Sequence, residues 1–277
     1  QHQALAILVG FGIAGTGFGI ILPLIGRASS PERRSLTLGI GSAIGSAGQV
    51  LGPPAAEILL QSFPWQTVFL IFAAVILLTL LALPILKPPA RTSTHTEPSE
   101  PMLTVLNRAL RDPSYMLIFL GFFSCGYQLG FITAHFPAFI TEVCGPIDPG
   151  GLLAGMGIGT TSALGAAAIA VIGVANIGGS VLSGWLGGLF SKKYLLAAIY
   201  TGRTLASAIF ILLPMTPTSV LVYSAVMGSL WLATVPLTSG LVAQIYGVRY
   251  MGTLYGFVFL SHQIGSFLGV WLGGRMY

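Results

Sequence analysis

Eight long apolar stretches dominate this sequence, and across them only Glu57 and Arg203 are charged residues that lie clear of an end. Charged residues make up 7% of the chain, whereas a soluble domain has roughly 25%. Each stretch is long enough to cross the hydrocarbon core of a bilayer, which needs about 20 apolar residues as a helix. The sequence therefore predicts an all-α integral membrane protein with spans at residues 4–25, 37–60, 65–86, 115–140, 162–190, 194–213, 220–243 and 252–277.

The basic residues orient this bundle, because Lys and Arg in short loops stay in the cytoplasm. Arg203 lies inside a span and Arg275 alone at the opposite face, and the other ten of the 12 basic residues fall on one side. The first span therefore runs from outside to cytoplasm, and we expect a multi-pass protein of the cell (inner) membrane. The net charge of +5 reflects topology; no nucleic-acid partner is expected, because no loop combines basic residues with interleaved aromatic ones. The ten residues on the predicted cytoplasmic side are Arg27, Arg33, Arg34, Lys87, Arg91, Arg108, Arg111, Lys192, Lys193 and Arg249.

Internal repetition indicates a duplicated unit. Residues 22–39 recur loosely at 235–256, and the small-residue run around Gln49 resembles the run around Gln263. Transporters are often built from such repeats, with a shared site between the halves. We expect eight spans of a twelve-helix protein that has three further helices before Gln1 and one after Tyr277. Residues 1–86 then belong to an N-terminal half and residues 115–277 to a C-terminal half.

The only extended polar run lies between these halves. Residues 87–114 contain Pro88, Pro89, Pro98 and Pro101 with Thr and Ser between them, which is typical of a solvated linker. The segment from Met102 to Arg111 follows and predicts a short amphipathic helix on the membrane surface. We expect this linker to be cytoplasmic.

Two glycine-rich motifs stand out in the sequence. The second span carries Gly39, Gly48, Gly52 and Pro53, followed by Ala56 and Glu57. This spacing resembles the fifth-helix motif of the major facilitator superfamily, with Ala56 and Glu57 in place of its last two glycines. Glycines at such spacing let helices touch backbone to backbone. A second segment fits the superfamily's cytoplasmic loop motif at Gly184, Lys192 and Lys193, with Gly188 and Leu189 where that motif has Asp and Arg.

Other segments are similar to bacterial members related to the monocarboxylate and oxalate–formate transporters, namely residues 121–128, 133–137, 234–240 and 260–268. The resemblance implies a secondary active transporter that moves a small organic solute by alternating access about a site near the bilayer midplane. It implies a monomer in the lipid bilayer, with H⁺ or a counter-anion as coupling partner in symport or antiport. With three further helices before Gln1, the resemblance implies that the spans at residues 4–25, 115–140 and 220–243 line the substrate cavity.

Arg203 is the principal candidate ligand. It lies about 14 Å along its span at 1.5 Å per residue, where a guanidinium costs at least about 2.5–3.5 kcal/mol. A function or a buried partner must compensate this cost. The charge suits a carboxylate, so a monocarboxylate-like anion is favoured over a cation; the alternative is that Arg203 snorkels to the interface.

Further polar residues are candidates for the substrate site, each with helix packing as the alternative. His262 is a proton carrier or ligand by its chemistry, and His135 and Glu57 are candidates for proton coupling or gating, with interhelical bonding and interfacial solvation as their respective alternatives. The remaining candidate substrate ligands are Gln263, Gln128, Tyr127, Asn176, Trp231, Thr234 and Thr238.

No enzyme constellation is present. The sequence has no paired carboxylates on one helix face, no metal-spaced His and Cys cluster and no phosphate-binding Gly-Lys loop, so neither a metal nor another cofactor is expected. Cys125 and Cys144 receive no role from sequence. The competing class is a non-transporting membrane sensor or a degenerate transporter, which the Gly188 replacement favours.

The predicted orientation is testable by labelling. In a cysteine-free version of the full-length protein, single cysteines at Thr94 and Asp148 should react with impermeant reagents from opposite sides of the membrane, because the basic loops stay cytoplasmic. Labelling of both positions from the same side would overturn the orientation.

Overall fold

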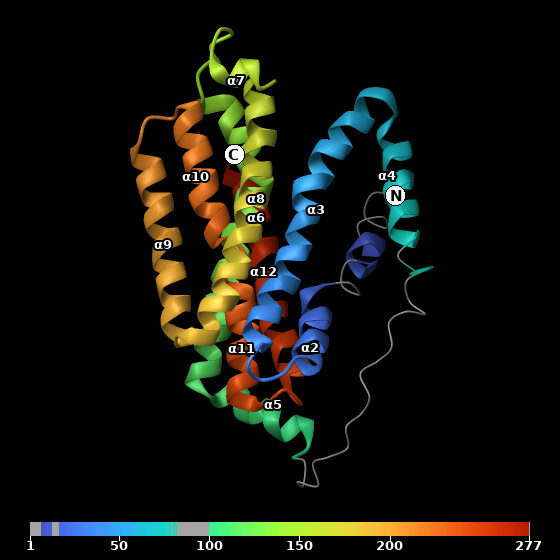
Figure 1. Ribbon diagram of the computed structural model, residues 1–277, viewed down its shortest axis with the longest axis vertical. Coiled ribbons are helices and arrows are strands. Elements are labelled where there is room, and N and C mark those ends of the chain that lie inside the picture. The colour runs from blue at the N-terminus through green and yellow to red at the C-terminus, as the bar shows by residue number, and fades with distance from the viewer. Residues whose placement is uncertain (1–6, 13–16, 79, 82–99, 277) are drawn as a thin grey trace.

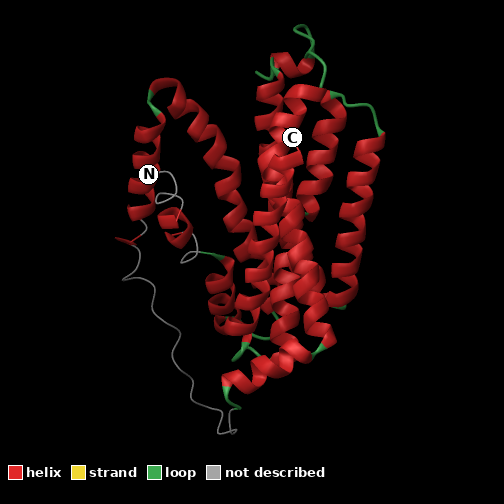
Figure 2. Cartoon of the chain, turned by 180° about the vertical axis from the view of Figure 1, so that it is seen from behind, coloured by secondary structure: helices red, strands yellow, loops and turns green. Residues whose placement is uncertain are grey.

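The computed structural model describes residues 7–12, 17–78, 80–81 and 100–276. These residues form helices and connecting loops, with no strand among them (Figures 1 and 2). A helix satisfies its backbone polar groups internally, as the bilayer requires. The main elements are α2 (Phe18–Ala28), α3 (Arg34–Ser62), α4 (Trp65–Leu78), α5 (Met102–Arg111), α6 (Pro113–Val143), α7 (Leu152–Gly155), α8 (Thr161–Leu189), α9 (Lys192–Leu212), α10 (Pro217–Leu230), α11 (Thr234–Tyr246) and α12 (Met251–Met276).

Five helical segments of the described chain are long and apolar enough to span a membrane. They are α6, α8, α9, the stretch Pro217–Tyr246 that holds α10 and α11, and α12. The Gly- and Ser-rich α3 is not among these five, but its 29 residues extend about 43 Å at 1.5 Å per residue. The described parts of α2 and α4 are shorter apolar helices. The predicted all-α membrane fold is confirmed.

The seventh predicted span is not one helix. The span predicted over residues 220–243 lies within the apolar stretch Pro217–Tyr246, which is long enough to cross a membrane. This stretch is interrupted: α10 ends at Leu230 and α11 begins at Thr234. Pro236 contributes to the break, because proline lacks a backbone N–H and its ring clashes with the carbonyl of residue i−4, here Leu232. In place of the continuous i→i−4 hydrogen bonds of an α-helix, Val235 N donates a hydrogen bond to Leu232 O at 2.9 Å.

Two short helices lie at the ends of the bundle. The predicted amphipathic helix is present as α5, in which Val105 and Ala109 are fully buried while Arg108 and Arg111 are exposed. Residues 87–99 of the linker lie outside the described part of the chain. At the other end, α7 is a one-turn helix in a loop for which the sequence predicted no secondary structure.

Asp112 joins α6 to α11 at the end of the bundle where α5 lies. It is the N-cap of α6, and its Oδ1 accepts a hydrogen bond from Ser114 N at 2.9 Å. Its Oδ2 accepts a hydrogen bond from the hydroxyl of Tyr246 at 2.6 Å. The bond from Tyr246, followed by that from Ser114, holds the pKa of the Asp112 carboxyl below its ordinary value, since both bonds favour the charged form.

Glycines bring several helix pairs into backbone contact. A Cβ on Gly39 of α3 would meet Ser180 O at 2.7 Å and Gly184 Cα of α8 at 2.9 Å. Between α6 and α12, Gly126 lies against the backbone of His262 and Gly265 against that of Phe123. Membrane helices associate through such close packing, since lipid offers no hydrophobic driving force between them.

Only part of the predicted fifth-helix motif makes this contact. Gly48 and Gly52 have no atom within 4 Å of a would-be Cβ. Gly48 lies nine residues after Gly39, which turns it about 180° around the helix axis at 3.6 residues per turn, so it faces away from α8. The side chain of Pro53 lies outside the described part of the structure.

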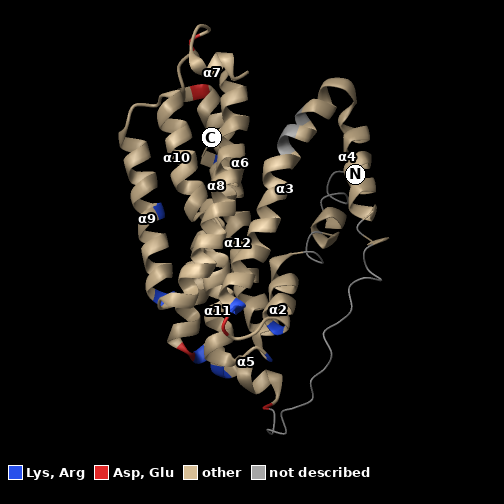
Figure 3. Cartoon of the chain, viewed as in Figure 1, with Lys and Arg blue, Asp and Glu red and all other residues tan. Residues whose placement is uncertain are grey.

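The N-terminal and C-terminal helices meet at one end and diverge toward the other. Gly26 of α2 lies against Met251 of α12, and Val50 lies against Gly173 of α8. Beyond that point α3 leads away from α8 and carries α4 with it (Figure 1). Most of the described Lys and Arg residues gather at the closed end (Figure 3). The bundle is therefore closed on the side predicted to be cytoplasmic.

The Gly39 contact predicts unequal effects of two similar substitutions. Gly39→Leu should lower the melting temperature of the purified full-length protein, because overpacking a close contact costs about 1–3 kcal/mol. Gly48→Leu on the same helix is the matched control and should melt near the wild type. Equal melting of the two variants in a thermal unfolding assay would contradict the assigned contact.

Candidate functional site

Arg203 lies in the core of the C-terminal helices. Its side chain on α9 is 1% exposed, and its Nη1 donates a hydrogen bond to the Sγ of Cys125 on α6 at 3.0 Å. The hydroxyl of Thr234, the first residue of α11, lies 3.5 Å from the same sulfur. Three helices therefore converge on the Cys125 sulfur.

The burial of Arg203 excludes the snorkelling alternative, because a side chain that reached the interface would be exposed. No carboxylate of the described side chains lies deep within a span. Those carboxylates occupy loops, caps or the last turn of a helix: Glu32, Glu100, Asp112, Glu142 and Asp148.

Unpartnered polar atoms gather around the same place. Five buried side-chain nitrogen or oxygen atoms of the described residues lack a hydrogen-bond partner, and four belong to Arg203 (Nε and Nη2), Tyr255 (hydroxyl) and His262 (Nε2). Tyr255 and His262 both lie near the Cys125 sulfur. Such atoms are rare in native proteins and call for a ligand or another explanation. We call Cys125, Arg203, Thr234, Tyr255 and His262 the polar cluster.

His262 connects the polar cluster to an exposed residue. Its ring packs against Phe122, with centroids 4.9 Å apart, and stacks on Phe259 at 5.7 Å. Its Nδ1 lies 3.4 Å from Oε1 of Gln263, whose side chain is exposed. The two ring nitrogens therefore have different surroundings, with Nε2 buried and Nδ1 beside an exposed amide.

A cavity of about 250 Å³ lies one helical turn from the polar cluster. Leu129 follows Cys125 by four residues on α6, and Ser266 follows His262 by four on α12, so each lies above its partner on the same helix face. Trp231 lies in the break three residues before Thr234. We call this the outer cavity; it is lined by Leu129, Gly130, Thr133, Ala134, Trp231, Ser266 and Val270.

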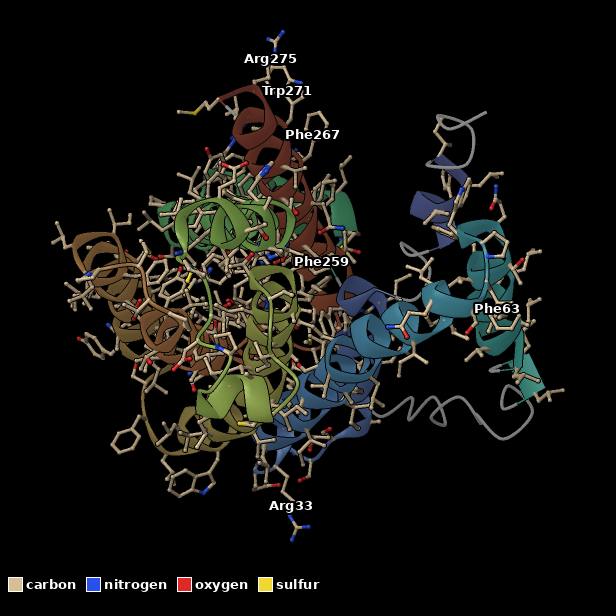
Figure 4. The ribbon with its side chains drawn as sticks, turned by 90° about the horizontal axis from the view of Figure 1, so that it is seen from above. Arg33, Phe63, Phe259, Phe267, Trp271 and Arg275 are labelled. Carbon is tan, nitrogen blue, oxygen red and sulfur yellow. The ribbon has the colours of Figure 1, made fainter. Side chains whose placement is uncertain are left out.

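The outer cavity lies on the side of α12 that faces the N-terminal helices. Phe259 packs against Gly19 of α2, and Figure 4 shows Phe259 on that side of the bundle. Ser266 follows Phe259 by seven residues and so shares its helix face. Phe267, Trp271 and Arg275 point away from the bundle at the far end of α12 (Figure 4).

A second hollow lies between α6, α9 and α10. This groove of about 360 Å³ is lined mainly by aromatic and aliphatic side chains. The Nε2 of Gln128 donates to the hydroxyl of Ser207 at 3.1 Å, and that hydroxyl lies 3.3 Å from the hydroxyl of Tyr223. His135 also lines the groove, and its Nε2 donates to the carbonyl oxygen of Val270 at 3.0 Å.

Asn176 links the helix break to α3. It is fully buried on α8, and its Oδ1 accepts a hydrogen bond from Leu232 N at 2.9 Å. Its Nδ2 donates to the hydroxyl of Ser46 on α3 at 2.8 Å, and Ser180 donates to its Oδ1 at 3.2 Å. The amide of Asn176 is thus used for packing across the closed end and does not line the outer cavity.

The remaining candidates are dispersed. Thr238 is buried in the half of the bundle nearer the basic residues, and Tyr127 packs against the backbone of Gly265 and Gly269. Lys192 donates to the carbonyl oxygen of Gly187 at 2.8 Å. Two other positions of the loop motif are less constrained, because Lys193 lies over the ring of Tyr194 and Gly188 has open space beside it. The Glu57 side chain lies outside the described part of the structure.

Sequence reasoning missed Cys125 and Tyr255. A cysteine and a tyrosine in apolar spans are ordinary packing residues, so neither attracts attention alone. A signal did exist: Gly126 and Gly130 on one helix, with Gly265, Gly269 and Gly273 on another. Small residues spaced by four predict a close helix pair, and Cys125 adjoins the first of them.

Comparison with known proteins identifies the family. Residues 2–270 match the Major Facilitator Superfamily. The chain belongs to this superfamily. A relative within it is an uncharacterized MFS-type transporter, YcxA, of Bacillus subtilis (strain 168), which is 25% identical over 252 residues. That match covers 88% of this chain and 58% of the relative, so the chain spans less than two thirds of the length of this superfamily member.

Asn176 generates a prediction about stability. Asn176→Ala should lower the melting temperature of the full-length protein, because it leaves the part-buried Leu232 N–H without its partner, at a cost of about 1–3 kcal/mol. Ser180→Ala removes one bond to the same amide without uncapping the break and should have a smaller effect. Equal melting of the two variants would show that Asn176 does not stabilise the break.

Proposed function

We propose that the full-length protein is a secondary active transporter of a small, monocarboxylate-like organic anion. Membership of the Major Facilitator Superfamily supports alternating access in a cell (inner) membrane, with the monomer as the working unit. The observation that carries the choice of an anion is the buried Arg203 guanidinium, with two unpartnered N–H groups.

The free atoms of Arg203 suit a carboxylate. Its Nη1 is engaged with Cys125, while Nε and Nη2 have no partner among the described residues. Nε and Nη2 form one edge of the planar guanidinium, and two parallel N–H bonds from such an edge match the two oxygens of a carboxylate. Lysine offers no such fork. The arrangement therefore favours a planar anion over a neutral solute.

We propose that the substrate reaches this edge from the outer cavity, one helical turn away. Its lining is mostly apolar, with Trp231, Thr133 and Ser266 as larger or polar groups, which suits a small solute with a short apolar part. Thr234, His262 and Gln263 offer further hydrogen bonds nearby. Tyr127 and Gln128 lie on α6 with Cys125, and Thr238 lies on α11 with Thr234. Since Arg203 is 1% exposed, binding requires the cluster to open by local movement.

Alternating access then requires the closed end to separate. The contacts to be broken are those of Gly39 with Gly184, of Gly26 with Met251 and of Asn176 with Ser46. These contacts join helices on either side of the predicted half-domain boundary. We propose that their loss opens the cytoplasmic side while the outer side closes.

A non-transporting sensor or a degenerate transporter is the alternative. It is favoured by Gly188, which stands where the superfamily's loop motif has an acidic residue. Uptake of radiolabelled pyruvate, lactate and oxalate by proteoliposomes containing the full-length protein separates the two classes. Absence of uptake for all three anions would favour the sensor.

Arg203 provides the sharper test. Arg203→Ala should lower the initial rate of anion uptake by about 10- to 100-fold, which corresponds to losing a charged hydrogen-bond donor worth about 1.5–3 kcal/mol. Arg203→Lys should restore the rate only in part, because an ammonium keeps the charge and loses the planar fork. Rates are compared at matched membrane abundance.

Arg275→Ala is the matched control. Arg275 is also a helical arginine, but its guanidinium lies over the exposed Trp271 ring at 5.2 Å from the centroid, away from the polar cluster. This variant should transport normally. Near-normal uptake by Arg203→Ala, or full rescue by lysine, would remove Arg203 from the substrate site.

A further inference from the structure

The positive charge of Arg203 is balanced by no carboxylate of the described side chains. The hydrogen-bond acceptor that its guanidinium contacts there is the Cys125 sulfur, at 3.0 Å, and Cys125 is itself 1% exposed. An unpaired charge is strongly disfavoured in so enclosed a site, whereas a thiol becomes an anion by losing one proton. We infer that Cys125 is a thiolate in the empty site and takes up one proton for each carboxylate that binds to Arg203.

The other ionisable groups around Cys125 restrict where this proton can go. Arg203 and Tyr200 approach it from α9, and Tyr255 and His262 from α12, while Thr234 of α11 does not titrate. Arginine and tyrosine keep their protons at neutral pH. The Cys125 thiol is therefore the acceptor of the proton, with the His262 imidazole as the neighbouring group whose two nitrogens can relay it.

The charge balance couples the binding of a carboxylate to Arg203 with the uptake of a proton by Cys125. In the empty site, the cation of Arg203 and the anion of Cys125 sum to zero. A carboxylate on the Nε and Nη2 edge adds one negative charge, and formation of an S–H bond with a proton from the external water returns the sum to zero. On the cytoplasmic side the carboxylate leaves, the S–H bond breaks and the proton follows it. This cycle rests on the proposed transport function and makes it an electroneutral symport.

His262 provides a route for the proton. Its Nδ1 lies beside the exposed Gln263, and its Nε2 is buried without a partner near Cys125. An imidazole that gains a proton at one nitrogen can release the proton of the other. In the Nε2–H tautomer, with the Gln263 amide turned so that its NH2 group faces Nδ1, a proton that arrives at Nδ1 from the side of Gln263 is exchanged for one that Nε2 passes to the sulfur.

The transport test uses Cys125→Ser, which keeps a small hydroxyl-bearing side chain but does not ionise at neutral pH. In proteoliposomes, pyruvate uptake by the wild type should increase with an inward proton gradient and respond little to membrane potential. In Cys125→Ser the proton no longer accompanies the anion, so uptake should lose its response to the proton gradient and slow when the interior is made negative.

Cys144→Ser is the matched control, since Cys144 is a free, buried thiol at the outer end of the bundle, and it should behave as the wild type. A Cys125→Ser protein that still moves one proton with each pyruvate would overturn the inference while leaving anion transport established. If the wild-type protein takes up none of the three anions pyruvate, lactate and oxalate, that result would instead contradict the proposed function.

Infrared spectroscopy tests the thiolate without any transport. The S–H stretching band lies clear of most protein absorption, and the spectrum of the full-length protein minus that of Cys125→Ser isolates the band of Cys125. Substrate-free protein at neutral pH should show no such band, and acidification should produce it. An S–H band from Cys125 at neutral pH would overturn the inference, whatever the protein transports.

Discussion

Close backbone packing at glycines is the constraint on which this bundle depends. Lipid is as apolar as the side chains, so helices in a bilayer gain little from hiding apolar surface from one another and rely on close contact and hydrogen bonds. Gly39 and Gly184 provide that contact between α3 and α8, and Gly126 and Gly265 provide it between α6 and α12. A side chain at any of these positions would separate the pair.

The same packing creates the polar cluster. Cys125 adjoins Gly126, which lies against the backbone of His262, so the closeness of α6 and α12 brings thiol and imidazole together. The break before α11 allows Thr234 to reach the same sulfur, and Arg203 enters from α9. Four separate segments of the chain therefore meet at a point that is sealed from both lipid and water.

The spans, the short α5 helix and the depth of Arg203 were predictable because they depend on local composition and periodicity. The partners of Arg203 were not, since these depend on the rotation and register of helices far apart in sequence. Proline alone did not predict the break either: α6 continues through Pro137, whereas the chain is interrupted before Pro236. The difference is that Asn176 accepts the freed Leu232 N–H, a contact that no local pattern reveals.

The interruption between α10 and α11 has an electrical consequence. A helix that begins inside the membrane directs the unpaired N–H groups of its first turn, and their partial positive charge, toward whatever lies before it. Here the first residue of α11 is Thr234, beside the Cys125 sulfur. The N–H end of α11 therefore adds a local positive potential beside this sulfur, and the carbonyl end of α10, which ends at Leu230, partly offsets it.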